Sequence, residues 1–251
     1  MWQRVLKRTV IAVGSIFRPL FSRLGIDLKA RYELNYWRRQ ARREGQLSNL
    51  FYRRLFTDVI GLTEESYQGE RVLDIGCGPR GSLEWMTNSS MRIGIDPLLP
   101  DYAQFGIAQH SMLYTAAAAE HLPFRSQSFD IVTSLNSLDH VDDLEASLSE
   151  IRRVLRMGGI FVLLVEVHRY PTLAEPISIP WDLTRTLRTE FEVVREQHFE
   201  ESPKRRGSSA AASAGVLFDH SDDRVRVGTL LAVLRRTQQS GSTPRRLPGQ
   251  E

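Results

Sequence analysis

A glycine-rich turn that follows a short apolar run constrains the fold of this chain most. Residues 72–82 read VLDIGCGPRGS, in which Gly76, Gly78 and Gly81 have the spacing G-x-G-x-x-G. Glycines at this spacing allow a tight turn between a strand and a helix and a close approach of the backbone to a ligand. The spacing predicts an α/β domain that binds a nucleotide or nucleoside, and it leaves the choice of ligand open.

Short apolar runs alternate with helical segments along the rest of the chain. We expect strands at 71–76, 92–96, 112–117, 129–135, 159–167, 191–199 and 224–236. Strands that alternate with helices imply a parallel sheet built from right-handed crossovers. One helix is expected to begin after Asp142 or Asp143 and to end at Gly158 and Gly159. Residues 27–61 predict two further helices, broken at EGQ.

The chain of 251 residues, 41% hydrophobic, is long enough for one full α/β core. We divide it into a basic helical extension or lid at 1–68 and a main domain at 69–236. Residues 202–226 are expected to form a mobile loop, and 237–251 a disordered tail. Residues 1–54 hold 13 Lys and Arg against 3 Asp and Glu, whereas 55–200 hold 11 against 22. This division indicates an acidic body with a basic extension.

The single cysteine, Cys77, excludes an intrachain disulfide and favours a reducing compartment, so we expect a cytoplasmic protein. No apolar run is long enough to span a bilayer. The apolar and basic side chains of residues 1–24 are compatible with an interfacial helix on an anionic membrane. A helix packed on the domain would show a similar stripe, and both alternatives stay open.

Two carboxylates follow the first two expected strands of the domain and bear on the ligand. Asp74 lies two residues before the first glycine, where it would repel the pyrophosphate of a dinucleotide. The same carboxylate would favour S-adenosylmethionine, which carries an ammonium and a sulfonium. Asp96 stands where a carboxylate accepts hydrogen bonds from ribose hydroxyls. The pair predicts a positively charged nucleoside ligand.

With these residues, the segments RIGIDP, AEHLPFRSQSFDIV, SLNSLDHVDD and SEIRRVLRMGGIFVL resemble the class I S-adenosylmethionine-dependent methyltransferases. The resemblance covers about residues 71–167 and is to the group with a type 11 methyltransferase domain, which includes ubiquinone and menaquinone biosynthesis methyltransferases. It implies a Rossmann-like, mostly parallel seven-stranded sheet with helices on both faces and a helical N-terminal extension. It also implies a cofactor site formed by Asp74, Gly76, Cys77, Gly78, Asp96, Pro97, Ala119, Glu120, Leu135 and Asn136. Ala118 replaces the aspartate that contacts adenine in much of the family.

Methyl transfer is an in-line displacement in which the protein mainly positions donor and acceptor. If the acceptor is a hydroxyl, a base helps, and the candidates are His140, Glu166 and His168, which follow the expected fourth and fifth strands. We expect no metal ion and no nucleophilic role for Cys77.

The acceptor is expected to be a small molecule or a glycan or lipid intermediate, walled by residues 169–181. No specific nucleic acid is expected, because the run SLNSLD lacks the Asn/Asp-Pro-Pro-aromatic pattern of base methyltransferases. Two alternatives are a non-catalytic scaffold with a methyltransferase-like fold and a dinucleotide-dependent oxidoreductase. The oligomeric state is left open.

Overall fold

The computed structural model describes residues 27–172, 174–201, 207–222, 224 and 226–237. The membrane alternative for residues 1–24 and nearly all of the expected tail lie outside these residues. Among the described residues, none of the helices is both long enough and apolar enough to cross a bilayer.

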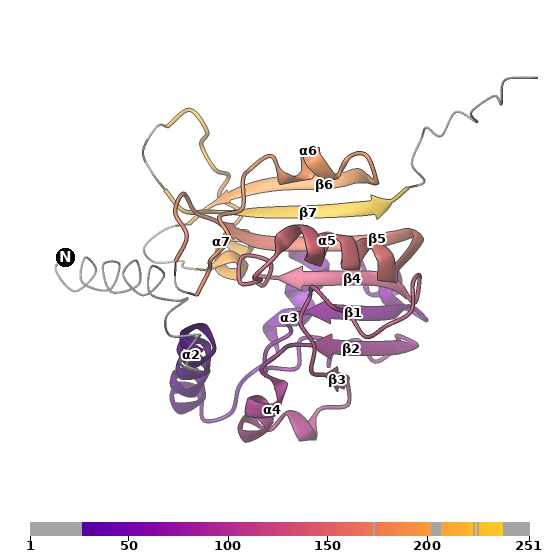
Figure 1. Cartoon of the computed structure of the whole chain (residues 1–251), viewed down its shortest axis with the longest axis vertical. Helices are drawn as coiled ribbons and strands as arrows, with labels where there is room; N and C mark the ends of the chain where they lie inside the picture. Colours follow the sequence, from indigo (N-terminus) through magenta and orange to yellow (C-terminus); the bar gives the residue numbers. More distant parts are fainter. Residues whose placement is uncertain (1–26, 173, 202–206, 223, 225, 238–251) are drawn as a thin grey trace, which may run out of the picture.

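A seven-stranded sheet in the order β3-β2-β1-β4-β5-β7-β6 forms the centre of the domain (Figure 1). Strands β1 to β5 are parallel to one another, whereas β7 runs antiparallel to both β5 and β6. All seven expected strands are confirmed, and so is the mostly parallel sheet. Their bounds are β1 Arg71–Ile75, β2 Met91–Ile95, β3 Leu113–Thr115, β4 Phe129–Leu135, β5 Leu155–Val167, β6 Phe191–Glu200 and β7 Gly228–Arg236.

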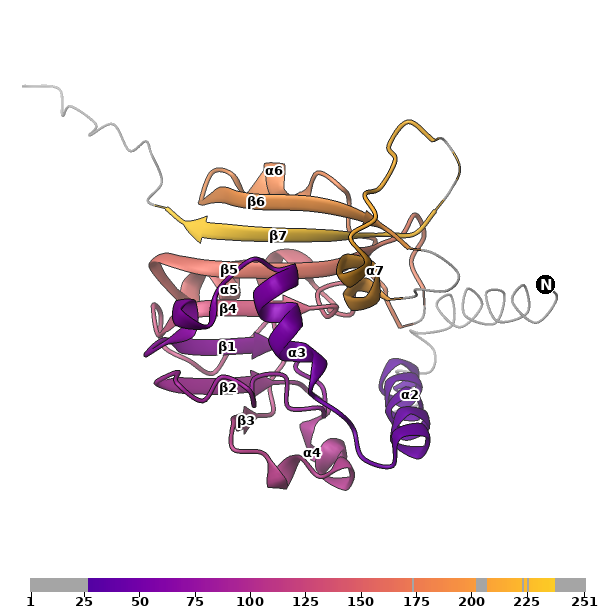
Figure 2. The same cartoon turned by 180° about the vertical axis from the view of Figure 1, so that it is seen from behind.

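Helices cover both faces of the sheet, as expected. One face carries α5 (Leu144–Val154) and α6 (Leu183–Leu187), which lie in front of the strands in Figure 1. The other face carries α3 (Phe51–Arg54), the π-helical turn Leu55–Val59 and α7 (Ser208–Ala214), seen in Figure 2. Alternate residues along each strand enter the two cores, so that Val132 packs under α5 while Ile131 packs under α3.

Short helical segments join these elements. They are α4 (Leu99–Tyr102) and the 3₁₀ turns Glu64–Tyr67, Ala103–Phe105 and Ile107–Gln109.

Two local expectations are corrected. Residues 208–214, expected within a mobile loop, form α7, because this alanine-rich run has high helix propensity and buries Ala211 and Ala212. Helix α5 is capped by Asp143 as expected, but it ends at Val154 rather than at the glycines. Leu155 already has extended geometry and begins β5, so Gly158 and Gly159 lie inside this strand.

Helix α2 (Leu28–Glu44) stands apart from both layers, at the carboxyl ends of the central strands (Figures 1 and 2). Asp27 caps its start through a hydrogen bond from the amide of Ala30, and Gly45 ends it with φ 74°. Of the expected N-terminal helices, this one is placed to cover the edge of the sheet at which ligands bind in α/β folds.

Candidate functional site

A cavity opens at the carboxyl edge of the sheet, between α2 and the turns that follow β1, β2 and β4. Its walls contain Gly76, Asp96, Pro97, Ala119, Glu120, Asn136 and His140 from the expected site. The structure therefore brings together six of the ten expected cofactor residues and one of the three expected bases. Other walls come from Asp27, Lys29, Ala30, Glu33, Ile75, Ile95, Leu98, Tyr102, Ala117, Ala118, Ser137, Val141 and Asp142.

Asp96 is the buried carboxylate of this cavity. Its Oδ1 accepts a hydrogen bond of 2.9 Å from the amide of Leu98, and its Oδ2 accepts one of 3.2 Å from the amide of Gly78. Each oxygen keeps a second lone pair, so that the group can accept two further hydrogen bonds. Burial raises the pKa of Asp96 to about 6, and the two amides act against this rise.

The glycine turn lies against the segment after β4. Gly76 has φ 67°, and a Cβ placed on it would lie 2.2 Å from Cβ of Ser137. Asn136, which directly precedes Ser137, also lines the cavity. It has φ 56°, and its buried Oδ1 has no hydrogen-bond partner among the described residues. The glycine turn therefore presents backbone rather than side chains to the cavity, and Asn136 adds the unpaired oxygen of its side-chain amide. Such a wall suits a polar ligand.

A third wall is apolar. Residues 117–119, part of a run of four alanines, line the cavity together with Leu98 and Tyr102. Glu120 holds this wall in place, because its Oε1 accepts hydrogen bonds from the amides of Asp142 and Asp143 at 2.8 and 3.1 Å. An apolar wall of this kind suits a flat ring system.

Helix α2 supplies wall residues that the sequence did not single out, among them Lys29 and Glu33. Lys29 donates to the carbonyl oxygen of His140 at 2.6 Å and to Oδ1 of Asp142 at 3.1 Å. Glu33 lies one turn further, and burial raises its pKa. Trp37 packs on the glycine turn, since a Cβ on Gly78 would lie 3.0 Å from its ring. Lys29, Glu33 and Trp37 are spaced four residues apart and so lie on one face of the helix. This spacing was the signal in the sequence that could have identified them.

Asp74, Cys77 and Leu135 do not reach the cavity wall, although the family resemblance implied that they would. Side chains alternate along a strand, which turns Asp74 toward the α3 face, where it accepts hydrogen bonds from Ser82 and from Thr133 (2.6 Å). Leu135 faces the same core. Cys77 is buried against Gly94, and burial raises the pKa of its thiol. Gly78 contributes its amide to Asp96.

The three expected bases separate in the structure. His140 lines the cavity, with its Nε2 3.8 Å from Oδ1 of the fully buried Asp139. His168 is buried behind this pair. Glu166 is in hydrogen-bonding contact with Glu201, and burial beside this second carboxyl raises the pKa of Glu166 far above its usual range. A carboxyl group that keeps its proton at neutral pH is a poor base, so Glu166 is not placed to act as one.

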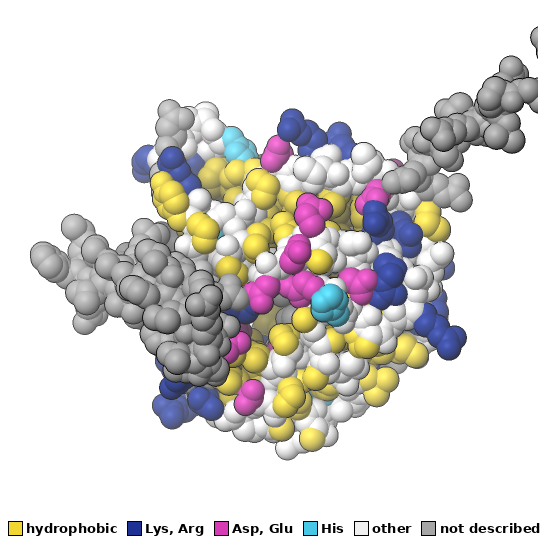
Figure 3. All heavy atoms as spheres, viewed as in Figure 1, with side chains coloured by type: hydrophobic (Ala, Val, Ile, Leu, Met, Phe, Trp, Pro, Cys, Tyr) yellow, Lys and Arg dark blue, Asp and Glu magenta, His cyan; other side chains and the backbone are white. Residues whose placement is uncertain are grey.

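Charge discriminates between the two classes of nucleoside ligand. Five carboxyl groups and one lysine line the cavity, and Figure 3 shows acidic side chains gathered on this side of the molecule beside a histidine. A pyrophosphate would be repelled here, whereas an ammonium and a sulfonium would be attracted. We expected Asp74 to favour S-adenosylmethionine over a dinucleotide, but the carboxyl groups of the cavity wall have this effect instead. The residues present fit S-adenosylmethionine.

The fold and this cavity define a nucleoside-binding α/β domain of the methyltransferase type. Residues 73–163 match the sequence family described as methyltransferase domain. Residues 73–163 therefore form a methyltransferase domain, and this match implies S-adenosylmethionine as its cofactor.

Known proteins of several kinds are similar to this chain. Demethylmenaquinone methyltransferase of Thermobifida fusca is 31% identical over 134 residues, which are 47% of this chain and 55% of that protein. Chloroplastic tocopherol O-methyltransferase of Arabidopsis thaliana is 28% identical over 127 residues, 47% of this chain and 36% of that protein. An S-adenosylmethionine-dependent methyltransferase from Mesorhizobium loti has the same fold, with a TM-score of 0.52, 18% identity and coverage of 72% of this chain and 100% of that one. The chain spans less than two thirds of the length of these two curated relatives.

Proposed function

We propose that this chain transfers a methyl group from S-adenosylmethionine to a hydroxyl oxygen of a small molecule or of a glycan or lipid intermediate. When bound, the cofactor supplies an electrophilic methyl carbon on a sulfonium. The protein's part is to fix the two reactants in line, to exclude water and to receive the hydroxyl proton.

The cavity wall provides the contacts that would hold the cofactor. Asp96 would accept hydrogen bonds from the ribose hydroxyls, and the alanines at 117–119 would contact adenine opposite Tyr102. Gly76 and Asn136 lie where the methionine part would pass, with the unpaired Oδ1 of Asn136 as an acceptor for its ammonium.

The observation that carries the acceptor class is the position of His140. This residue forms part of the cofactor cavity and also lies 3.8 Å from the buried carboxylate of Asp139, beside Glu175. A cofactor cavity with an imidazole in its wall, and with two carboxylates beside that imidazole, is suited to an acceptor that must lose a proton. Hydroxyl acceptors need this help, which supports O-methylation over methylation of carbon or sulfur.

Helix α2 would close the site over the bound cofactor. Lys29 already joins the start of this helix to the turn that carries His140. A covered site keeps water from competing with the acceptor for the methyl group.

Methyl transfer can be measured with S-adenosylmethionine labelled on its methyl group and three acceptor classes: phenols and catechols, free sugars, and lipid-linked sugars. We expect alkali-stable label in at least one hydroxylated class. His140→Ala should lower kcat by about 10²-fold or more, with the affinity for S-adenosylhomocysteine nearly unchanged. The matched control is His121→Ala, at an exposed position of the loop after Glu120. Cofactor binding without transfer to any of the three classes would contradict the proposal.

A further inference from the structure

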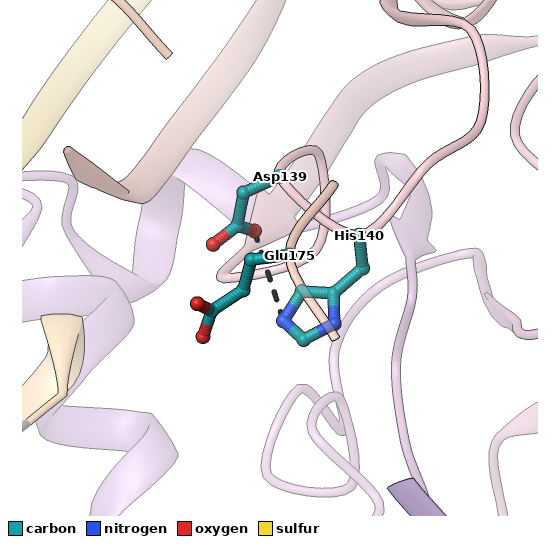
Figure 4. A group of neighbouring side chains, drawn as sticks. All are labelled: Asp139, His140 and Glu175. Carbon is teal, nitrogen blue, oxygen red and sulfur yellow. Dashed lines mark ion pairs between the residues drawn. The ribbon is translucent and has the colours of Figure 1, made fainter. Parts of the chain in front are cut away.

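Three potential metal ligands meet beyond the cofactor cavity. Asp139 and His140 come from the turn after β4, and Glu175 comes from the segment after β5 (Figure 4). One ligand atom from each residue lies within 4.8 Å of the other two. Two ligands on opposite sides of one ion, each about 2.1 Å from it, are about 4.2 Å apart. The three atoms therefore need only small shifts to share an ion.

Hydrogen bonds within the backbone hold the two segments together. The amide of Ile177 donates to the carbonyl oxygen of Asp139 at 3.2 Å, which joins the segment of Glu175 to the turn after β4. Thr172 orients Glu175 by donating to its Oε2 at 3.0 Å while accepting from its amide at 2.9 Å. Ligand residues supported in this way are positioned before an ion arrives.

Asp139 is the first sign that something is bound here. Its exposed fraction is 0%, and neither carboxylate oxygen has a hydrogen-bond partner among the described residues. A buried carboxylate without donors is strongly unfavourable unless a cation or a proton compensates it. His140 and Glu175 are its neighbours in the cluster. They can compensate the charge of Asp139 only by binding a cation together with it or by exchanging a proton.

His168 provides an independent sign. Its exposed fraction is 8%, and its Nδ1 lies 2.7 Å from the carbonyl oxygen of Tyr170. A carbonyl oxygen only accepts, so Nδ1 carries the hydrogen, and the Nε2 of the neutral ring presents a lone pair. This Nε2 is buried without a hydrogen-bond partner and lies 3.8 Å from Oε2 of Glu175. Two electron-pair donors that face each other require a cation or a proton between them.

The same arrangement of His168 is typical of metal-binding histidines, in which the second ring nitrogen donates to a carbonyl or carboxylate.

We infer that Asp139, His140 and Glu175, with His168 as a fourth ligand, form a site for a divalent first-row transition metal ion. A set of two imidazoles and two carboxylates suits Mn²⁺, Fe²⁺ or Zn²⁺, whereas Ca²⁺ prefers oxygen ligands alone. Nothing in the sequence spacing predicted this site, because its ligands come from two segments, 139–140 and 168–175, that are 28 positions apart at their nearest residues.

The ion would lie next to the cofactor cavity, which His140 also lines. A coordination position that the protein leaves open would hold a hydroxyl oxygen of the acceptor and lower its pKa, so that the hydroxyl proton would pass to solvent and His140 would act as a ligand rather than as the base. This role rests on the proposed function, whereas binding of the ion does not.

Binding of the ion is tested on the full chain after chelator treatment and buffer exchange, without cofactor or acceptor. Titration with Mn²⁺, followed by loss of the free-ion electron paramagnetic resonance signal, should show one site, and Zn²⁺ should compete for it. Asp139→Asn and Glu175→Gln should each weaken Mn²⁺ binding by about 10-fold or more. Glu145→Gln, at an exposed carboxyl in the first turn of α5, is the matched control and should bind as the wild type does.

Circular dichroism and S-adenosylhomocysteine affinity show whether each variant is folded. Folded wild-type protein that binds neither Mn²⁺ nor Zn²⁺ would overturn the inference, as would folded Asp139→Asn and Glu175→Gln proteins that bind Mn²⁺ as tightly as the wild type. Because methyl transfer is not part of this readout, failure of the proposed function would leave the result for the ion unaffected.

Discussion

Arg80 of the glycine turn forms a two-pronged ion pair with Glu44 at the end of α2. Its Nη1 donates to Oε2 at 2.7 Å and its Nη2 to Oε1 at 2.6 Å, and the guanidinium also lies 5.5 Å from the centre of the Trp37 ring. A third hydrogen bond reaches the carbonyl oxygen of Ser48. The side chain of Arg80 thus joins α2, which covers the site, to the glycine turn.

Removal of this tie should loosen α2 without unfolding the sheet. We expect Arg80→Ala to lower the free energy of unfolding by about 1–2 kcal/mol, because charge-assisted hydrogen bonds are lost from a side chain that is only 11% exposed. Hydrogen exchange of α2 amides should become faster while the β4 and β5 amides stay protected. Arg38→Ala, at an exposed position of the same helix, is the control. Equal exchange in the two variants would contradict a tethering role for Arg80.

We expect Gly76 to tolerate no side chain. Comparison with Gly158 separates the steric clash at Gly76 from backbone strain. Gly76 and Gly158 both have positive φ, 67° and 74°, but a Cβ on Gly76 would meet Ser137 whereas one on Gly158 would meet nothing within 4 Å. Gly158→Ala should therefore lose about 1 kcal/mol from backbone strain alone. Gly76→Ala should lose about 1–3 kcal/mol more from the clash. Urea unfolding measures both, and similar losses in the two variants would refute the close approach.

Asp74 should make stability depend on pH. Burial raises its pKa to about 6, despite hydrogen bonds from Ser82 and Thr133. The folded protein therefore binds this proton more tightly than the unfolded chain does, so stability is greatest below pH 4 and falls as the pH rises through 6. The fall attributable to this group is about 2–3 kcal/mol.

Asp74→Asn has no charge to bury and should lose this part of the pH dependence. The measurement is urea unfolding of both proteins at pH 4 and pH 8, and the difference between the two pH values should be smaller for the variant. Stability curves that stay parallel over this range would contradict the raised pKa of Asp74.

The strands and their order along the chain could be predicted because each contains a short apolar run between turns, although β5 begins four residues earlier and β7 four residues later than expected. Asp96 and Asn136 lie on the cavity wall because each directly follows a strand at the edge where ligands bind, whereas Ala119 lies four residues after β3 and was implied by the family resemblance. Asp74 and Leu135 were expected at the cofactor but lie outside the cavity wall, because they belong to strands, in which alternation decides the face that a side chain occupies.

The rest of the site depends on long-range contacts that local patterns do not contain. Lys29 and Glu33 reach the cavity only because α2 folds back over the sheet. Glu175 meets Asp139 only because two loops at one sheet edge are joined by a backbone hydrogen bond. Both loops had been recognised as neighbours of the acceptor, but their mutual geometry had no signature in the sequence.

Asp96 offers the most direct test of the central claim, that the acidic cavity under α2 is the S-adenosylmethionine site. Calorimetry of the full chain should show binding of S-adenosylhomocysteine in the micromolar range, with NAD at least about 100-fold weaker, since the cavity repels a pyrophosphate. Asp96→Asn should lose about 1.5–3 kcal/mol of this affinity, the usual contribution of hydrogen bonds to a charged group. Asp101→Asn, at an exposed carboxyl of α4, should bind as the wild type does. Folded Asp96→Asn protein with unchanged affinity, or tight binding of NAD, would contradict the account.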